Sequence, residues 1–316
     1  MNKLLLTMAL LGAVAPSVAH AQDSLVFVKV VPVPINVIGM MATVTPFIGG
    51  LKEPQGLARD LNGDIIVCDY GAGEVLRFSK AGEKIAVLAT GLKSPSQIVS
   101  AGLGSFFVTE RKANRVIKLS GGAAEPVGGE IIEPLGLISG LRTRGQTKVS
   151  YDSYSFFVVA HTTSKIYVSE ADVISPYDGI GVANYKPVNP IWRLVYAAPD
   201  EDGDTGRYGL RCLAGDGDTV FVSDEVGGDV LMMSSGGRMA KFVSGFDDPS
   251  GMAIRGDWLY VCDEGNGGQL WKVNKNGKKT LVAEKLGRPR NVLFLDDKTA
   301  LISDRDGRVL KLNWDK

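Results

Sequence analysis

Histidine is almost absent from this chain of 316 residues, which contains only His20 and His161. Zinc sites built from several histidines and proton shuttles that need a histidine pair are therefore excluded. A Ser-His-Asp arrangement would have to use His161, which ends a strand-like run and is expected to have a structural role there. Most histidine-based catalysis is thus out of reach.

An excess of charge and an even number of cysteines are also lacking. The 35 lysines and arginines balance the 35 acidic residues, so the chain has no electrostatic footprint for nucleic acid. The cysteines are Cys68, Cys212 and Cys262, an odd number that leaves at least one thiol free or intermolecular. We expect buried free thiols, and only the Cys212–Cys262 pair merits testing as a disulfide.

The N-terminus predicts export. Lys3 precedes a short apolar stretch at residues 4–14, and Ala19-His20-Ala21 has the form of a signal-peptidase site. The stretch is too short to span a bilayer as a helix. Residues 1–21 are therefore predicted to be a signal peptide, and the mature chain to lie in a bacterial periplasm or outside the cell, without a transmembrane span.

A second apolar segment follows the cleavage site. Residues 25–38 are strongly apolar, but Lys29, Pro32 and Pro34 interrupt them. Together with the β-branched residues, this composition favours an extended conformation over a membrane helix. Residues 22–41 are predicted to form an apolar extended arm packed on the fold, with a partner-binding arm and membrane contact as alternatives.

One short sequence pattern recurs along the rest of the chain, an apolar run that ends in an acidic residue. The six carboxylates are Asp69, Glu110, Glu170, Asp224, Asp263 and Asp304. Most copies follow a motif of the form Pro-x-x-apolar at the start of the unit, as at Pro54, Pro95 and Pro249, and we call this motif the opening. Turn residues separate further short runs. Such units predict an all-β, six-bladed propeller of four-stranded antiparallel blades.

The last unit ends without room for a fourth strand. Residues 42–48 read as a strand and precede the first opening, so they are predicted to pair with the last blade and close the ring. One propeller domain would then span residues 42–316. The openings and acid-terminated runs resemble NHL repeats and SMP-30/gluconolactonase-like propellers over residues 50–316. That resemblance implies a metal-dependent lactonase or esterase with acid and Asn ligands at the channel mouth.

The third unit departs from the others through two predicted insertions, at 139–155 and 171–190. Loops of this length in a compact repeat are often binding elements. Tyr177 and Tyr185 in the second insertion could stack on a sugar or peptide, although packing within the loop is an alternative.

The six carboxylates allow two interpretations. Each could accept backbone N–H bonds from a neighbouring turn, as recurrence in every unit favours. Alternatively, some of them could bind a ligand or a calcium ion at the mouth, together with Gln55, Gln97 and Asn291. The candidate metal ligands are Glu170, Asp224 and Asp263.

The sequence leads to a monomeric, exported propeller that binds a protein, peptide or glycan through the face bearing the openings. No catalytic residue is assigned. The alternatives are a calcium-dependent hydrolase of small lactones or esters and a structural component of an envelope complex.

Overall fold

Short strands separated by turns make up nearly all of the described structure. The computed structural model describes residues 42–102, 104–127, 142–143, 146–147, 165–170, 179–184, 192–197, 210–216, 219–233 and 239–314. All of them belong to one unit of the chain, Ile38–Lys316. Its described helical pieces are two three-residue 3-10 turns, η1 (Arg111–Ala113) and η2 (Gly265–Gly267). Within the described residues, no helix has the length and apolar character needed to cross a membrane.

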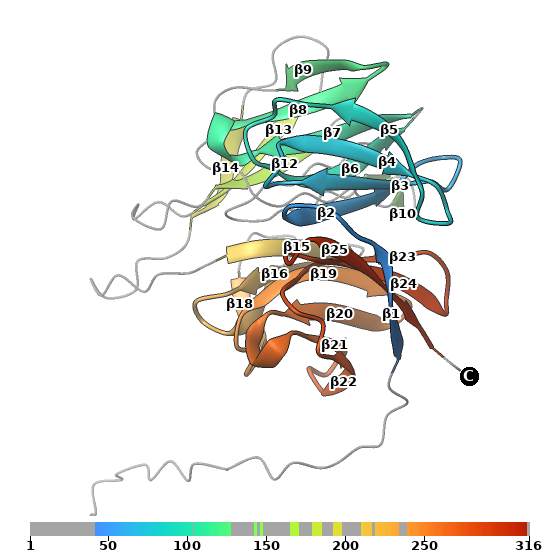
Figure 1. Cartoon of the computed structure of the whole chain (residues 1–316). Coiled ribbons are helices and arrows are strands. Elements are labelled where there is room, and N and C mark those ends of the chain that lie inside the picture. Colours follow the sequence, from blue (N-terminus) through green and yellow to red (C-terminus); the bar gives the residue numbers. More distant parts are fainter. Residues whose placement is uncertain are drawn as a thin grey trace, which may run out of the picture. The chain divides into compact units, whose positions relative to one another are not determined.

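Five antiparallel sheets of four strands each form the blades of a β-propeller (Figure 1). The first blade contains β2 (Pro54–Arg59), β3 (Ile65–Asp69), β4 (Glu74–Phe78) and β5 (Lys84–Ala89). The second contains β6 (Pro95–Gly102), β7 (Ser105–Glu110), β8 (Arg115–Ser120) and β9 (Ala123–Val127). The β15 blade contains β15 (Leu210–Asp216), β16 (Thr219–Asp224), β17 (Asp229–Met233) and β18 (Met239–Ser244). The β19 blade contains β19 (Pro249–Arg255), β20 (Trp258–Asp263), β21 (Gln269–Asn274) and β22 (Lys279–Glu284).

The closing blade joins the two ends of the propeller. It contains β23 (Pro289–Phe294), β24 (Thr299–Asp304), β25 (Arg308–Asn313) and the N-terminal β1 (Thr43–Ile48). β1 pairs antiparallel with β25, from Thr43 opposite Asn313 to Ile48 opposite Val309. The predicted pairing of residues 42–48 with the last unit is confirmed, and it covers an edge that would otherwise stay unpaired.

The predicted number of six four-stranded blades is wrong, because the described residues form five. In the third unit the structure has a three-stranded sheet of β12 (Lys165–Glu170), β13 (Gly179–Asn184) and β14 (Trp192–Ala197). It also has a two-stranded hairpin of β10 (Arg142–Thr143) and β11 (Gln146–Thr147). The Pro134 opening of that unit lies outside the described residues.

The segment predicted as the 171–190 insertion contains a strand. β13 lies between β12 and β14 and pairs antiparallel with both. Its sequence, Gly-Ile-Gly-Val-Ala-Asn, alternates glycine with apolar residues. Glycine and asparagine are common in turns, so this composition suggests a loop when pairing partners are unknown. The partners on both sides make it the middle strand of a sheet.

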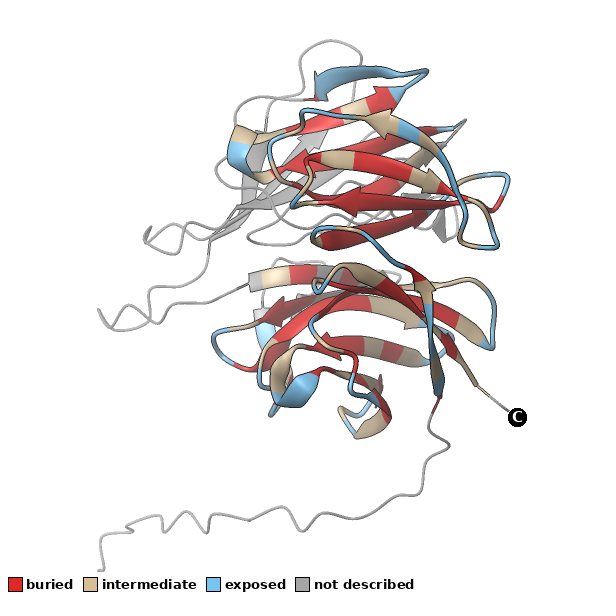
Figure 2. Cartoon of the chain, in the orientation of Figure 1, coloured by how far each residue is buried: buried red, intermediate tan, exposed pale blue. Residues whose placement is uncertain are grey.

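The acid-terminated runs are apolar at successive positions because the second strand of a blade, such as β3, is buried on both faces (Figure 2). Ile66 and Cys68 of β3 pack in a core with the second blade, where Ile98 and Val108 are also buried. The alternate residues of β3 pack against the closing blade instead. A strand with cores on both sides needs apolar residues at every position rather than at every second one.

The three cysteines lie in three different cores. Cys68 belongs to the core between the first and second blades, Cys212 to the core between the β15 and β19 blades, and Cys262 to the core between the β19 and closing blades. All three are buried, and none of them forms a disulfide. Cys262 faces the opposite side of its blade from Val261, which packs with Cys212. The sheet therefore lies between the two thiols, and the Cys212–Cys262 disulfide is not formed.

Two glycines in the openings allow neighbouring blades to approach closely. A Cβ atom at Gly56 would lie 2.7 Å from the carbonyl oxygen of Ser96, and one at Gly251 would lie 2.2 Å from that of Arg290. Both distances are far below van der Waals contact, so only glycine fits there. The Pro-x-Gly form of these two openings thus reflects blade-to-blade packing.

Candidate functional site

The repeat carboxylates and the openings lie on one face of the propeller. Pro54 lies opposite Asp69 in the strand register, and Pro249 lies opposite Asp263. The other described blades show the same pairing at Pro95 with Glu110, Leu210 with Asp224, and Pro289 with Asp304. The register shifts directly after each opening, and such bulges redirect side chains at sheet ends. We call this side of the molecule the opening face.

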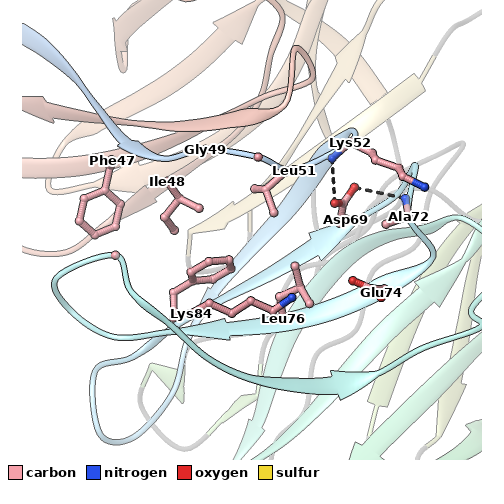
Figure 3. A pocket seen from close by; sticks show the side chains of 13 residues that line it. Phe47, Ile48, Gly49, Leu51, Lys52, Asp69, Ala72, Glu74, Leu76 and Lys84 are labelled. Carbon is pink, nitrogen blue, oxygen red and sulfur yellow. Dashed lines mark hydrogen bonds between the residues drawn. The ribbon is translucent and has the colours of Figure 1, made fainter.

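Asp69 shows what a repeat carboxylate does. Its oxygens accept hydrogen bonds from the backbone N–H groups of Lys52 and Glu53, both at 2.9 Å, and of Ala72 at 3.3 Å. Figure 3 shows the bonds from Lys52 and Ala72. The carboxylate thereby holds the segment that enters β2 against the turn that leaves β3.

The other described carboxylates bond in the same manner. Asp263 accepts from the N–H groups of Asp247, Asp248 and Gly265. Glu110 accepts from Lys93, Asp224 from Gly227, and Asp304 from Arg288 and Asp306. All five side chains are buried, with at most 3 % of their surface exposed. These carboxylates hold the turns of the opening face, and their predicted ligand-binding role stays a prediction.

Four residues singled out from the sequence cannot be placed by their side chains. Glu170 ends β12, where its backbone pairs with Gly179, but only its backbone is described. Tyr177, Tyr185 and His161 lie outside the described residues. The aromatic part of the predicted site is therefore not part of the described geometry.

Two of the three predicted amide side chains are in contact, and the third lies on the strand between them. Asn291 donates from Nδ2 to Oε1 of Gln97 over 2.8 Å. Their strands, β23 and β6, are separated by β2, which packs against both. Gln55 on β2 accepts from Ser96 Oγ at 2.9 Å and donates to Glu53 at 3.2 Å. The amides thus link the inner strands of three blades by side-chain hydrogen bonds.

A charged cluster occupies the opening face beside these amides, and we call it the mouth cluster. Its members follow the repeat carboxylates or flank the openings. They are Glu53, Arg211, Glu225, Asp248, Glu264, Arg290 and Arg305.

Glu264 is the centre of the mouth cluster. It forms a close ion pair with Nε of Arg290, and both side chains are only 7 % exposed. Arg305 lies 3.8 Å and Arg211 3.9 Å from its carboxylate oxygens. One carboxyl group therefore meets three guanidinium groups, one from the β15 blade and two from the closing blade.

The remaining members pair off around this centre. Arg211 contacts Glu225 and lies 3.2 Å from Asp248. Arg305 binds Glu53 at 2.6 Å. These side chains are between 18 % and 38 % exposed, so this part of the cluster meets solvent while Glu264 and Arg290 lie beneath it.

Burial sets the protonation of the acids in this cluster. It raises the pKa of Glu264 to about 8, against the opposing effect of Arg211 and Arg305. Burial also raises the pKa of Glu225 and of Asp248, again opposed by Arg211. At neutral pH the Glu264 carboxyl is largely protonated, a state that is uncommon for a glutamate and typical of functional sites.

Arg290 carries an unsatisfied donor. Its Nη1 atom is buried and has no hydrogen-bond partner among the described residues. A buried guanidinium N–H without an acceptor is costly, and native structures usually supply a water, an ion or a ligand at such a place. This atom is where the described site is incomplete.

Sequence reasoning missed the mouth cluster although a signal was present. The repeat directs attention to its regular carboxylate, whereas the functional candidates stand one position later. Those positions hold Tyr70, Arg111, Glu225, Glu264 and Arg305 in the five described copies. They vary in charge while their neighbours do not, which is the pattern expected of a site built on a repeated frame.

The described donors of the mouth cluster do not fit a calcium ion. The accessible carboxylates of the mouth cluster already face arginines, which supply positive charge where a cation would have to sit. Within the described chain, no group of three histidine, cysteine or acidic side chains could hold a metal. No catalytic step through calcium is therefore derived.

A separate hollow of about 450 Å³ lies where β1 runs on toward the first blade (Figure 3). Phe47 and Ile48 line it from the β1 side, and Leu76 and Lys84 from β4 and β5. Its lining mixes apolar and charged groups and does not include the mouth cluster. Nothing in the sequence pattern pointed to it.

Solved structures of β-propellers superpose on this chain. A gluconolactonase from Xanthomonas campestris superposes with a TM-score of 0.64 at 14 % identity, covering 87 % of this chain and 90 % of that one. A streptogramin B lyase gives 0.60 at 13 % identity, covering 87 % and 99 %. A virginiamycin B lyase from Staphylococcus aureus gives 0.58 at 11 %, again covering 87 % and 99 %. At such identities the likeness establishes the propeller fold alone.

No family model and no curated protein matches the chain by sequence. The expected likeness to gluconolactonase-type propellers therefore holds at the level of structure.

Proposed function

We propose that this protein is an exported propeller that binds a compact polar ligand at the mouth cluster. The ligand would be a free small molecule or the polar end of a peptide or glycan. The observation that supports this proposal is Nη1 of Arg290, which has no acceptor among the described residues, in a cluster whose other members form ion pairs. A deep charged cluster suits a small group better than a broad protein surface.

A deletion of residues 173–188, within the second predicted insertion, would not test the site cleanly. It would remove β13, the middle strand of a sheet, and would disturb folding. A paired substitution is sharper. Glu53→Gln with Arg305→Gln removes two opposite charges of the mouth cluster, leaves net charge unchanged and does not touch Arg290.

The experiment is a thermal-shift screen of polar metabolites, short peptides and oligosaccharides against the wild type. Hits should lose most of their stabilising effect on the Glu53→Gln/Arg305→Gln variant. Arg255→Gln with Asp297→Asn is the matched control, because this exposed ion pair lies away from the cluster. Hits that stabilise all three proteins equally would refute a ligand site at the mouth.

Export is the second part of the proposal, and it rests on the signal-like sequence of residues 1–21. Expression of the full chain in a Gram-negative bacterium, followed by fractionation and N-terminal sequencing, should give a periplasmic or secreted product that begins at Gln22. A cytoplasmic product that keeps Met1 would contradict it.

Hydrolysis of a small lactone or ester is a second candidate. It is favoured by Glu264, whose pKa of about 8 would let it act as a general acid or base beside arginines that can stabilise an oxyanion. Turnover of a lactone or chromogenic ester should fall at least a hundredfold in Glu264→Gln. An inactive wild type across such a panel would dispose of this candidate.

A further inference from the structure

The arginines of the mouth cluster are not equally compensated. Arg211 has two carboxylates of its own, Glu225 and Asp248, and Arg305 has Glu53. Arg290 has only Glu264, which the other two arginines also approach. Among the described ion pairs, Arg290 is therefore the arginine with no counterion to itself.

Glu264, the one described counterion of Arg290, is largely uncharged at neutral pH. Glu264 holds its proton up to a pKa of about 8 because burial disfavours its charged form. A protonated carboxyl can accept a hydrogen bond from Nε but does not neutralise the guanidinium. The buried positive charge and the unsatisfied Nη1 donor then call for the same thing, an anionic acceptor.

We propose that Arg290 anchors a subsite for the carboxylate group of a small ligand, with Glu264 as a built-in competitor for the same guanidinium. A guanidinium binds a carboxylate through charge-assisted N–H bonds, and Nη1 is the nitrogen of Arg290 that does not face Glu264 and has no acceptor among the described residues. The amides of Gln97 and Asn291, next along the inner strands, suit hydroxyl groups on the same ligand. This inference rests on the proposed function and specifies its ligand class.

The arrangement couples ligand binding to pH. As pH rises, Glu264 ionises and pairs with Arg290, and the ligand must displace it. The groups that face Glu264 are Arg211, Asp248, Arg290 and Arg305, with Glu225 acting on its charge from the β15 blade. The arginines stay charged throughout, so the titration of Glu264 dominates above neutral pH.

The test is calorimetric titration with malate, whose carboxylates are ionised at both pH values used. For a competitor with a pKa of about 8, the Kd of the wild type should rise about tenfold from pH 7 to pH 9. Glu264→Gln should bind at both pH values about as tightly as the wild type does at pH 7. Glycerol serves as the neutral probe and inorganic phosphate as the alternative oxyanion.

The double variant Arg290→Gln/Glu264→Gln should lose malate binding. It replaces both members of the Arg290–Glu264 pair by neutral amides, so neither is left as a lone buried charge and folding is preserved. Arg255→Gln removes one exposed positive charge and should bind normally.

Malate binding by the double variant, or a Kd of the wild type that does not change with pH, would overturn the proposal. Binding of glycerol as tight as malate, phosphate tenfold tighter than malate, or no saturable binding of any probe would also overturn it. Screen hits that depend on Arg305 but not on Arg290 would leave the mouth as a ligand site and remove only the carboxylate subsite.

Discussion

Asp263 and Glu264 are neighbours in the chain, and both carry a buried carboxyl group, yet their surroundings differ. Asp263 accepts backbone N–H groups from two segments and thereby holds the opening face together. Glu264 faces arginine side chains and has a raised pKa. The first position repeats in every blade because every blade needs the same turn. The second is free to differ, and the site is built there.

The largest expected effect tests the first half of this comparison. Asp69→Ala removes the acceptor for three backbone N–H groups and should lower the free energy of unfolding by about 3 kcal/mol. Urea denaturation measures the change. Asp257→Ala, at an exposed turn, is the control and should change stability by less than about 0.5 kcal/mol. A loss below about 1 kcal/mol for Asp69→Ala would mean that the repeat carboxylates are not structural.

The next effect concerns the close approach of neighbouring blades. Gly251→Ala places a Cβ atom 2.2 Å from the carbonyl oxygen of Arg290, and the resulting strain should lower the free energy of unfolding by about 2–3 kcal/mol. Gly49→Ala has open space around its Cβ atom and should be nearly neutral. Equal melting temperatures for the two variants would show that the blades can separate at this point without strain.

Titration of Glu264 should lower the free energy of unfolding by about 2 kcal/mol between pH 5 and pH 7. The folded protein keeps the proton up to a pKa of about 8, whereas the unfolded chain releases it near its ordinary value of 4.5. The folded state therefore binds more protons in this window, and wild-type stability falls as pH rises. Glu264→Gln does not titrate and should lack this decline.

Urea unfolding of both proteins at pH 5, 6 and 7 isolates the contribution of Glu264 as a difference. Parallel pH profiles for the wild type and Glu264→Gln would indicate that the Glu264 carboxyl titrates normally.

The smallest effect is expected at an ordinary surface ion pair. Arg255→Gln breaks a contact with Asp297, whose side chain is 86 % exposed, and should change the free energy of unfolding by less than about 0.5 kcal/mol. Thermal unfolding in low and high salt measures it. A larger loss would show that an exposed ion pair can matter as much for stability as a buried one. Burial would then not distinguish the mouth cluster from an ordinary surface ion pair.

Much of the fold could be predicted from the sequence because its cause is local. Ile65 to Cys68 are apolar in succession, and turn residues such as Asn62 and Gly63 bound the strands, so strand positions follow from composition. Closure by residues 42–48 followed from the missing last strand. The number of four-stranded blades did not follow, because the acid-terminated run of the third unit looks like the other five, whereas its described sheet has three strands. The strand β13 was missed because it has the composition of a loop and its identity as a strand depends on β12 and β14.

The candidate site was less predictable for a different reason. Gln97 and Asn291 could be named because they occupy equivalent positions in the openings, and the structure brings them into contact. Arg290 and Glu264 belong to different blades, and their pairing depends on how two sheets face each other. The raised pKa of Glu264 depends on burial that no single segment determines.

The pairing of β1 with β25 also determines when the protein can finish folding. Thr43 leaves the ribosome long before its partner Asn313, so early in synthesis the first strand has no partner. The ring can close only after nearly the whole chain has emerged. Until then the order of the strands keeps the ring open.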